Sequence, residues 1–280
     1  MKKVIVVTDS NATVPEHLVQ ELDIRVVPIL LNLDGHSYRD GIDLTPGEFY
    51  RLLRTNKHTP TTSAPSVGDF LRVYAAAAHE SAGIVAIHLP PQLSAIYNTA
   101  VLASQLVDGA PMRVVNSRSA TMAQGFVVLE AARAAAAGAD LDAVVARAEE
   151  IAAKAHFFAT LETLEYLHRG GRIGGAAALV GSVLQIKPIL YLVDGRVEPF
   201  AKPRTRRKAI RCMLQAMAEQ VGGRPIHAAV MQAGAVQEAE ELRQRVAEQF
   251  DCVELYLTEF TPVMGAHTGP GLLGVAFYVD

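Results

Sequence analysis

Residues 4–10 read Val-Ile-Val-Val-Thr-Asp-Ser, a short β-branched run that ends in polar residues. This pattern predicts a buried strand of a parallel sheet, because a strand covered on both faces carries apolar side chains on both. Pro15 suits the first turn of a helix that we expect to reach about Leu22. A strand followed at once by a helix indicates an α/β fold.

The same alternation of strand and helix continues to about residue 155. Further strands are expected over residues 24–33, 84–89 and 113–115, and Asp34-Gly35 predicts a tight turn after the first of them. Capping residues and Ala-rich stretches predict helices over residues 46–55, 66–79, 94–107, 122–137 and 141–155. Residues 1–155 therefore predict a parallel α/β/α lobe.

Residues 156–280 have a different order of predicted strands and helices, which indicates a mixed α+β lobe. Strands are expected over residues 157–160, 226–231, 253–260 and 272–279, with a hairpin over 189–200 that turns at Asp194-Gly195. Helices are expected over residues 161–169, 174–181, 205–221 and 235–250. No linker separates the two halves, so we expect tightly packed lobes, together one domain, with a ligand in the cleft between them.

The composition narrows the class of protein. The chain has 280 residues, is 50% hydrophobic and carries a net charge of −3, which fits a globular protein and argues against a nucleic-acid partner. The first apolar run ends too early for an export signal, and no apolar stretch is long enough to span a bilayer. The two cysteines, Cys212 and Cys252, form no disulfide framework or metal motif. We therefore expect a cytoplasmic protein with reduced thiols.

Several hydroxyls lie where an open parallel sheet binds ligands, beyond the carboxyl ends of its strands. Ser10, Ser94 and Ser117 each follow a predicted strand, and Thr62 lies in a proline-bracketed loop. Ser10 and Ser117 are interpreted first as ordinary cap or turn residues. Thr62 and Ser94 precede predicted helices in stiff loops, so we favour a cradle for a carboxylate or phosphate there.

Basic residues in the second half could meet such an anion. His267 lies in the glycine-rich stretch 265–271, which we interpret as a turn between two strands that carries a functional histidine. Arg172 comes just after a helix stop, and Arg204 leads into a basic run over residues 202–208. This run fits a solvated helix face as well as it fits anion capture, for which arginine offers bidentate hydrogen bonds.

The small residues over 174–181, Gly-Gly-Ala-Ala-Ala-Leu-Val-Gly, have two interpretations. Close helix packing is the plainer one. Alternatively, their missing side-chain volume forms the wall of a tunnel for an apolar tail. Each buried methylene contributes about 0.8 kcal/mol, so a chain of about 14 methylenes would supply on the order of 11 kcal/mol before ordering costs.

Motifs that run in order across nearly the whole chain carry a family resemblance. The first half contains Thr8-Asp9-Ser10, Pro60-Thr61-Thr62-Ser63-Ala64-Pro65-Ser66, and Leu93-Ser94 followed by Tyr97. The second half contains Tyr-Leu-His-Arg-Gly-Gly-Arg-Ile over 166–173, Ile-Lys-Pro-Ile over 186–189, the Lys202/Arg204 segment, and Gly-Ala-His-Thr-Gly-Pro-Gly over 265–271. With these motifs the sequence resembles the DegV family, whose characterised members are the fatty-acid-binding subunits of bacterial fatty acid kinase.

The resemblance implies a function in lipid metabolism. A long-chain fatty acid such as palmitate would lie in a buried tunnel, with its carboxylate bound by Thr62 and Ser94. His267 and Arg172, and also Arg204, would surround the head group and its acyl-phosphate form. A separate kinase subunit would transfer phosphate from ATP, so this chain would be a non-catalytic carrier without cofactor or metal, able to touch a membrane transiently.

Some positions depart from the family pattern. Ala95 and Ile96 stand where the family usually has Gly-Thr, so one hydroxyl is lost and we expect a narrower pocket mouth. Ala64 stands where Gln is common, and Asn116 where Asp is common. These changes bear on chain preference and on pairing with a kinase rather than on binding, because both carboxylate-binding hydroxyls are present.

Two other classes of protein are alternatives. A serine-dependent acyl hydrolase or acyltransferase would use Ser94 as nucleophile, His267 as base and Asp9 as the residue that orients the base. The chain has no Gly-x-Ser-x-Gly elbow for such a nucleophile. A nucleotide binder would need a glycine-rich turn after the first strand or a P-loop, and the sequence has neither.

Overall fold

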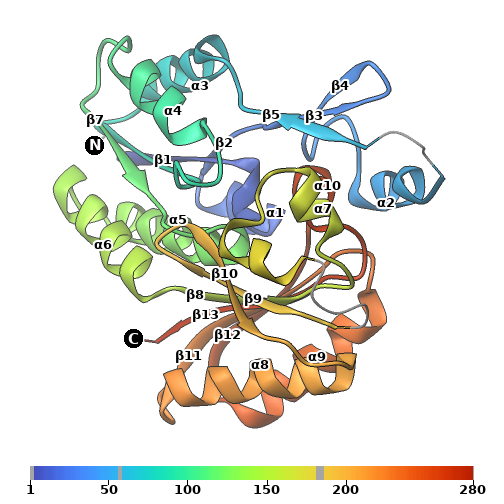
Figure 1. Cartoon of the computed structure of the whole chain (residues 1–280). Coiled ribbons are helices and arrows are strands. Elements are labelled where there is room, and N and C mark those ends of the chain that lie inside the picture. Colours follow the sequence, from blue (N-terminus) through green and yellow to red (C-terminus); the bar gives the residue numbers. More distant parts are fainter. Residues whose placement is uncertain (1–2, 56–58, 181–185, 280) are drawn as a thin grey trace.

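The computed structural model describes residues 3–55, 59–180 and 186–279. Its first sheet has four parallel strands in the order β2-β1-β6-β7. The strands are β1 (Val4–Asp9), β2 (Arg25–Val27), β6 (Gly83–His88) and β7 (Met112–Asn116). Every residue of β1 and β6 is buried, which explains their apolar, β-branched sequences. The predicted parallel sheet is confirmed (Figure 1).

Helices cover both faces of this sheet. α3 (Val67–Glu80) and α4 (Ile96–Ser104) lie on one face, whereas α5 (Thr121–Ala136) and α6 (Leu141–Lys154) lie on the other. Ser66 caps α3 as predicted, because its hydroxyl accepts from the Asp69 backbone N–H while its own N–H donates to the Asp69 carboxylate. A 3₁₀ turn, η1 (Ser10–Ala12), and α1 (Glu16–Glu21) connect β1 to β2.

The single strand predicted over residues 24–33 is wrong. The chain leaves the first sheet at Pro28, which has no backbone N–H to donate to a strand ladder. Beyond it, β3 (Leu30–Leu33) forms a small antiparallel sheet with β4 (His36–Arg39) and β5 (Thr61–Ser63). Asp34 and Gly35 make the predicted tight turn, with φ angles of 53° and 76°. The helix α2 (Pro46–Thr55) lies between β4 and β5 in the chain.

The second large sheet has six strands in the order β10-β9-β8-β13-β11-β12. β11 and β12 pair in parallel and the other neighbours pair antiparallel, which confirms the predicted mixed sheet. The strands are β8 (His156–Thr160), β9 (Ile189–Val193), β10 (Arg196–Ala201), β11 (Ile226–Gln232), β12 (Cys252–Glu259) and β13 (Leu273–Val279). α8 (Arg206–Val221) and α9 (Val236–Gln249) cover its outer face (Figure 1).

The two large sheets share one layer of helices. α5 and α6 pack against the first sheet on one side and against β13 on the other. Side chains of β13 alternate accordingly: Ala276 and Tyr278 join the core that contains β1 and α5, whereas Val275 and Phe277 join the core beneath α8 and α9. The chain therefore stacks in five layers, helix, sheet, helix, sheet and helix (Figure 1).

The remaining helices differ from the predictions in length and place. The helix expected over 161–169 is only α7 (Glu165–Arg169), which follows a hydrogen bond from Glu165 N to the Thr163 hydroxyl. The small-residue run forms a 3₁₀ turn, η2 (Gly174–Leu179), and Gly181 lies outside the described residues. The stretch 265–271 is not a simple turn, because residues up to 268 belong to α10 (Pro262–Thr268), which begins with a proline in its first turn.

α10 packs against the first half of the chain, where it contacts α2, β3 and β5. Gly265 permits this approach, since a Cβ at that position would lie 2.6 Å from the Phe49 ring and 2.8 Å from the Tyr50 hydroxyl. Tyr50 also donates its hydroxyl hydrogen to the Phe260 carbonyl at 3.2 Å. The first glycine of the 265–271 motif is thus explained by two aromatic rings packed against the helix.

Replacing Gly265 with alanine should therefore destabilise the fold. Overpacking against two buried rings costs about 1–3 kcal/mol, which would appear as a lower free energy of unfolding in urea titrations. Gly47→Ala is the matched control, because nothing lies within 4 Å of a Cβ there and Gly47 is also helical. That variant should be unchanged or up to about 1 kcal/mol more stable. Equal stability of the two variants would contradict this account of α10.

Candidate ligand-binding site

A cavity lies between the two halves of the chain, as the sequence predicts. Its wall is mostly apolar. The first half contributes Ile29, Leu89, Leu93, Ile96 and Ala120. The second half contributes Phe157, Leu161, Leu190, Leu192, Val197 and Leu272, mainly from β8, β9 and β10. An apolar wall with a few polar groups is typical of a pocket for a largely hydrocarbon ligand.

Four of the predicted site residues line this cavity: Thr62, Ser94, Arg172 and His267. Thr62 lies in the middle of β5, and His267 lies in the last turn of α10. The Thr62 hydroxyl oxygen and His267 Nε2 form a hydrogen bond of 2.8 Å, whose donor depends on the tautomer of the ring. This bond joins residues 205 positions apart in the sequence and connects the two halves at the cavity.

Arg172 links the His267 side of the cavity to the Ser94 side. Its Nε donates to the Leu93 carbonyl at 3.2 Å, and one terminal nitrogen donates to the Gly170 carbonyl at 2.8 Å. Two of its five N–H groups are used in this way. The Ser94 hydroxyl accepts from the backbone N–H of Ile96, the first residue of α4, at 3.3 Å. Thr62, Ser94, Arg172 and His267 therefore line the same cavity, and we call these four residues the polar cluster.

His267 is neutral at neutral pH. Burial, and next the positive charge of Arg172, lower the pKa of its imidazole to about 4. The imidazole is packed closely, since a Cβ at Gly170 would lie 2.5 Å from Nδ1. That nitrogen is buried and has no hydrogen-bond partner among the described residues. The positive charge next to the cavity is therefore the exposed guanidinium of Arg172 and not the imidazole.

The other predicted candidates lie outside this cluster. Arg204 is exposed in the segment between β10 and α8 and does not line the cavity, so its role near a head group stays a prediction. Ser10 donates to Asp40, and Ser117 donates to the Ser119 carbonyl. Both serines therefore have the structural roles that we interpreted first.

The structure does not assemble the triad of the hydrolase alternative. Asp9 is fully buried and accepts from His88 Nδ1 at 3.0 Å and from the Leu89 N–H at 3.1 Å, so the prediction that it orients His267 is wrong. His267 Nε2 faces Thr62. In the described part of the chain no hydrogen bond joins His267 to Ser94.

The small-residue segment packs against a strand and does not line the cavity. A Cβ at Gly174 would collide with the Val197 backbone, and one at Gly175 would collide with the Glu198 carboxylate. Among residues 174–180 none belongs to the cavity wall. Close packing is therefore confirmed at Gly174 and Gly175, and none of the described residues 174–180 forms a tunnel wall of this cavity.

Several cavity residues were missed by sequence reasoning. Met264 and Thr268 come from α10, and Tyr191 and Leu192 come from β9. The hairpin of β9 and β10 was predicted, but its alternating apolar residues were not assigned to a ligand. The signal was present: a strand with apolar residues on both faces needs a second apolar surface to cover it.

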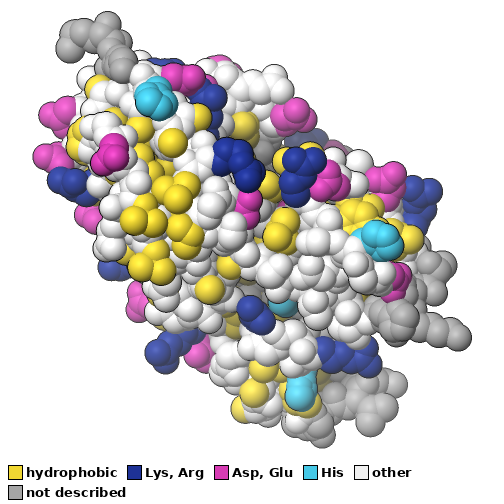
Figure 2. Space-filling view, turned by 90° about the horizontal axis from the view of Figure 1, so that it is seen from above, with side chains coloured by type: hydrophobic (Ala, Val, Ile, Leu, Met, Phe, Trp, Pro, Cys, Tyr) yellow, Lys and Arg dark blue, Asp and Glu magenta, His cyan; other side chains and the backbone are white. Residues whose placement is uncertain are grey.

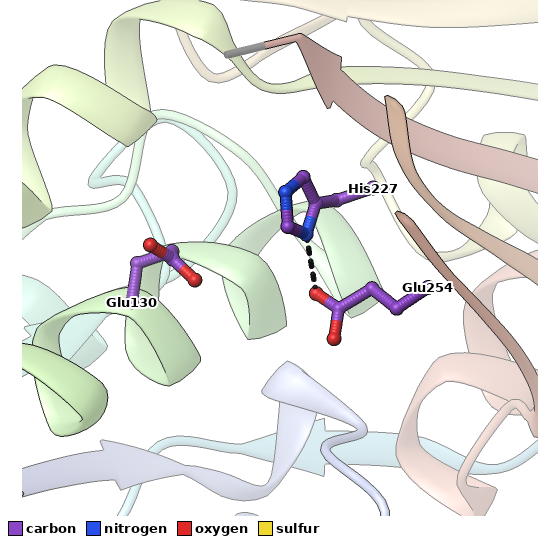
Figure 3. A group of neighbouring side chains, drawn as sticks. All are labelled: Glu130, His227 and Glu254. Carbon is purple, nitrogen blue, oxygen red and sulfur yellow. Dashed lines mark hydrogen bonds and ion pairs between the residues drawn. The ribbon is translucent and has the colours of Figure 1, made fainter. Parts of the chain in front are cut away.

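One group of side chains has the composition of a metal site. Glu130, His227 and Glu254 each place a ligand atom within 4.8 Å of the others, from α5, β11 and β12 (Figure 3). Arg133 already binds Glu130 at 2.7 Å and Glu254 at 2.6 Å. Burial alone would raise the pKa of Glu254, but hydrogen bonds from His227 and then Arg133 lower it to about 2. The cluster is a buried ion-pair network that ties α5 to the second sheet.

The surface of the protein gives fewer indications of function than the cavity does. The face shown in Figure 2 mixes side chains of both charges, with hydrophobic side chains gathered on the side of α3 and α4. Two large apolar side chains are exposed in this region, Leu102 on α4 and Leu106 just after its end. In the described part of the chain, no helix combines the length and the apolar character needed to cross a membrane.

The fold and the cavity define a class: α/β proteins with two stacked sheets and an apolar pocket between them. The family model for uncharacterised proteins of the DegV family matches residues 3–280. A DegV domain-containing protein of Streptomyces coelicolor is 38% identical over 276 residues, which cover 98% of each chain. The chain therefore belongs to the DegV family, as the sequence motifs predict.

Two solved structures share the whole architecture. A DegV family protein from Thermus thermophilus, described by its fatty acid binding, is 37% identical with a TM-score of 0.94, over 99% of this chain and 100% of that one. DegV of Bacillus subtilis, described as a fatty acid binding protein, is 30% identical with a TM-score of 0.93 over the full length of both chains. The predicted fold class is thereby confirmed.

Removing the charge of Arg172 should raise the pKa of His267 above about 4, because that charge is the second cause of its lowered pKa. In Arg172→Gln the pKa should stay below the ordinary value of 6.5, since burial remains the larger cause. A ¹⁵N NMR titration of the imidazole measures both. Arg204→Gln should leave the titration unchanged. A His267 that titrates near 6.5 in the unaltered protein would contradict the burial described above.

Proposed function

We propose that this protein binds a long-chain fatty acid such as palmitate. The acyl chain lies in the apolar cavity, and Thr62 and Ser94 bind the carboxylate. The observation that carries the proposal is the cavity itself: its wall is mostly apolar, and the hydroxyls of Thr62 and Ser94, the Arg172 guanidinium and the His267 imidazole all lie on it. The two structural relatives described as fatty acid binding support the same ligand class.

The energetic balance favours an amphiphile over a fully polar ligand. About 14 methylenes buried at about 0.8 kcal/mol each give on the order of 11 kcal/mol, from which the ordering of the chain must be subtracted. The free energy lost when an isolated carboxylate moves from water into an apolar interior is larger than this gain. The carboxylate is therefore expected at the polar cluster, where hydroxyls donate to it and Arg172 offers a positive charge.

We infer that the bound fatty acid is presented to a separate kinase, which converts the carboxylate to an acyl phosphate. The absence of a P-loop in the sequence supports a division of labour in which ATP binds elsewhere. Arg172 is exposed at the polar cluster, so a group near it would be reachable from outside. Fatty acid and ATP should give no acyl phosphate with this protein alone, and formation of it would contradict the inference.

Mass spectrometry of an organic extract tests the ligand directly. Protein purified without added lipid should release a fatty acid in near-stoichiometric amount, because a buried apolar chain leaves slowly. Protein stripped of lipid should take up palmitate. An empty protein that also fails to bind palmitate would overturn the proposed function.

Removing the Thr62 hydroxyl should weaken binding without unfolding the protein. Thr62→Val keeps the shape of the side chain but deletes a hydrogen bond to a charged group, worth about 1.5–3 kcal/mol. The palmitate Kd should therefore rise roughly 10- to 100-fold, and Ser94→Ala should act in the same direction. Thr61→Val is the matched control, since Thr61 is its exposed neighbour on β5 and does not line the cavity. Unchanged affinity in both Thr62→Val and Ser94→Ala would contradict the proposal that these two residues bind the carboxylate.

A further inference from the structure

The helix α10 forms one wall of the cavity along a seam with the first half of the chain. It contributes Val263, Met264, His267 and Thr268 to the lining. Across the seam, β5 and the loop that follows it contribute Thr62, Ser63 and Ala64. Separation of α10 from β5 would therefore open the cavity directly, at the edge where the polar cluster lies.

Among the described residues, two hydrogen bonds join α10 to the first half of the chain across the seam. Near the end of α10, His267 bonds to Thr62. At its start, the backbone N–H of Val263 donates to Asp40 Oδ1 at 3.1 Å. Asp40 follows β4 in the first half of the chain and is only 3% exposed.

Asp40 is itself fixed by the first half of the chain. The Ser10 hydroxyl donates to Asp40 Oδ2 at 2.7 Å and accepts from the Ile29 N–H at 3.2 Å. The carboxylate thus connects the end of β1 to the first turn of α10. The ionised form of a buried carboxylate becomes more favourable when the seam opens and water reaches it.

We propose that Asp40 is a positioning residue that sets how readily the seam between α10 and β5 opens, and hence how fast the cavity exchanges its ligand. The inference about ligand exchange rests on the proposed fatty acid binding. The inference about α10 itself does not, because seam opening can be followed in the ligand-free protein.

The direction of the effect follows from the electrostatics. Burial raises the pKa of Asp40 to about 6; hydrogen bonds from Ser10, Val263 and Thr261 act against this, and the charge of Asp9 adds to it. From α2 the buried Tyr50 faces the same carboxylate, and Glu259 at the end of β12 acts on that tyrosine. The closed seam therefore binds the Asp40 proton more tightly than an open, hydrated seam does. Protonation therefore favours closure: the opening equilibrium rises from about the ordinary pKa of 3.8 to about pH 6, where the closed form also ionises, and is level above that pH.

The test compares ligand release at pH 5 and pH 7 in the unaltered protein and in Asp40→Asn. An amide keeps an oxygen for the Val263 N–H and offers a donor to Ser10, but it carries no charge. With a closed-state pKa of about 6 and an ordinary value of 3.8, release from the unaltered protein should be about tenfold faster at pH 7 than at pH 5. Asp40→Asn should lack this increase. Titration of palmitate itself affects both proteins equally and cancels in the comparison.

Two further variants separate positioning from a general loss of stability. Asp40→Ala removes the acceptor of the Val263 N–H, so it should release palmitate faster than the unaltered protein at pH 5, and Asp40→Asn should restore slow release. Asp43→Asn is the matched control, because Asp43 lies in the same loop but pairs with the exposed Arg39. It should keep the tenfold difference between pH 5 and pH 7.

Amide hydrogen exchange of the ligand-free protein completes the test. After correction for intrinsic exchange rates, protection of residues 263–268 should fall from pH 5 to pH 7 in the unaltered protein and stay constant in Asp40→Asn. Identical pH profiles of release and of protection in the two proteins would overturn the role of Asp40. If the protein binds no fatty acid but the protection profiles differ as expected, the proposed function fails while the role of Asp40 in the seam stands.

Discussion

The packing of α5 between two sheets is the constraint on which the rest of the structure depends. Thirteen of its sixteen residues are buried, as required of a helix with no solvent face. Its small residues let the layers approach: a Cβ at Gly125 would lie 2.6 Å from the Ala12 carbonyl. The ion pairs of Glu130 and Glu254 with Arg133 fix the opposite face of the helix to β12. The two sheets are therefore held in one relative position by a single shared layer.

The cavity lies where this shared layer ends. Ala120, the residue before α5, belongs to the cavity wall, so the cavity lies at the N-terminal end of α5. The space is closed instead by β5, α10 and the β9–β10 hairpin. The polar cluster draws one residue from each of four separate segments, so it exists only because α5 and α6 fix the distance between the sheets. No single segment of the chain can form the polar cluster by itself.

Strong local signals made much of the fold predictable. β1, the capping of α3 by Ser66 and the turn at Asp194-Gly195, with φ angles of 47° and 77°, depend on neighbours in the sequence alone. The break at Pro28 could have been predicted from its missing N–H. α10 could not, because Gly265 within it and the glycines just after it argue against a helix, and its packing on Phe49 comes from a distant part of the chain.

The candidate site was predictable as a set of residues but not as an arrangement. Family motifs point to Thr62, Ser94, Arg172 and His267, and these four do line one cavity. The bond between Thr62 and His267 was not foreseen, since it spans 205 positions. Nor was the neutrality of His267, which follows from burial and from Arg172 rather than from its neighbours in the sequence. Arg204 also belongs to a family motif, but its segment does not line the cavity.

The separation of a neutral imidazole from an exposed guanidinium determines which way round an amphiphile can bind. A buried, protonated histidine would draw a carboxylate into the cavity, but the lowered pKa of His267 leaves only a polar, uncharged partner there. The positive charge is on Arg172, which lies at the cavity wall and is exposed to water. An ionised head group therefore loses least hydration beside Arg172, while each methylene gains by moving inward. For the proposed fatty acid ligand, these two terms act in opposite directions along one molecule and favour an orientation with the carboxylate outermost. In the proposed presentation to a kinase, a carboxylate in this orientation would need no large rearrangement of the protein to become accessible.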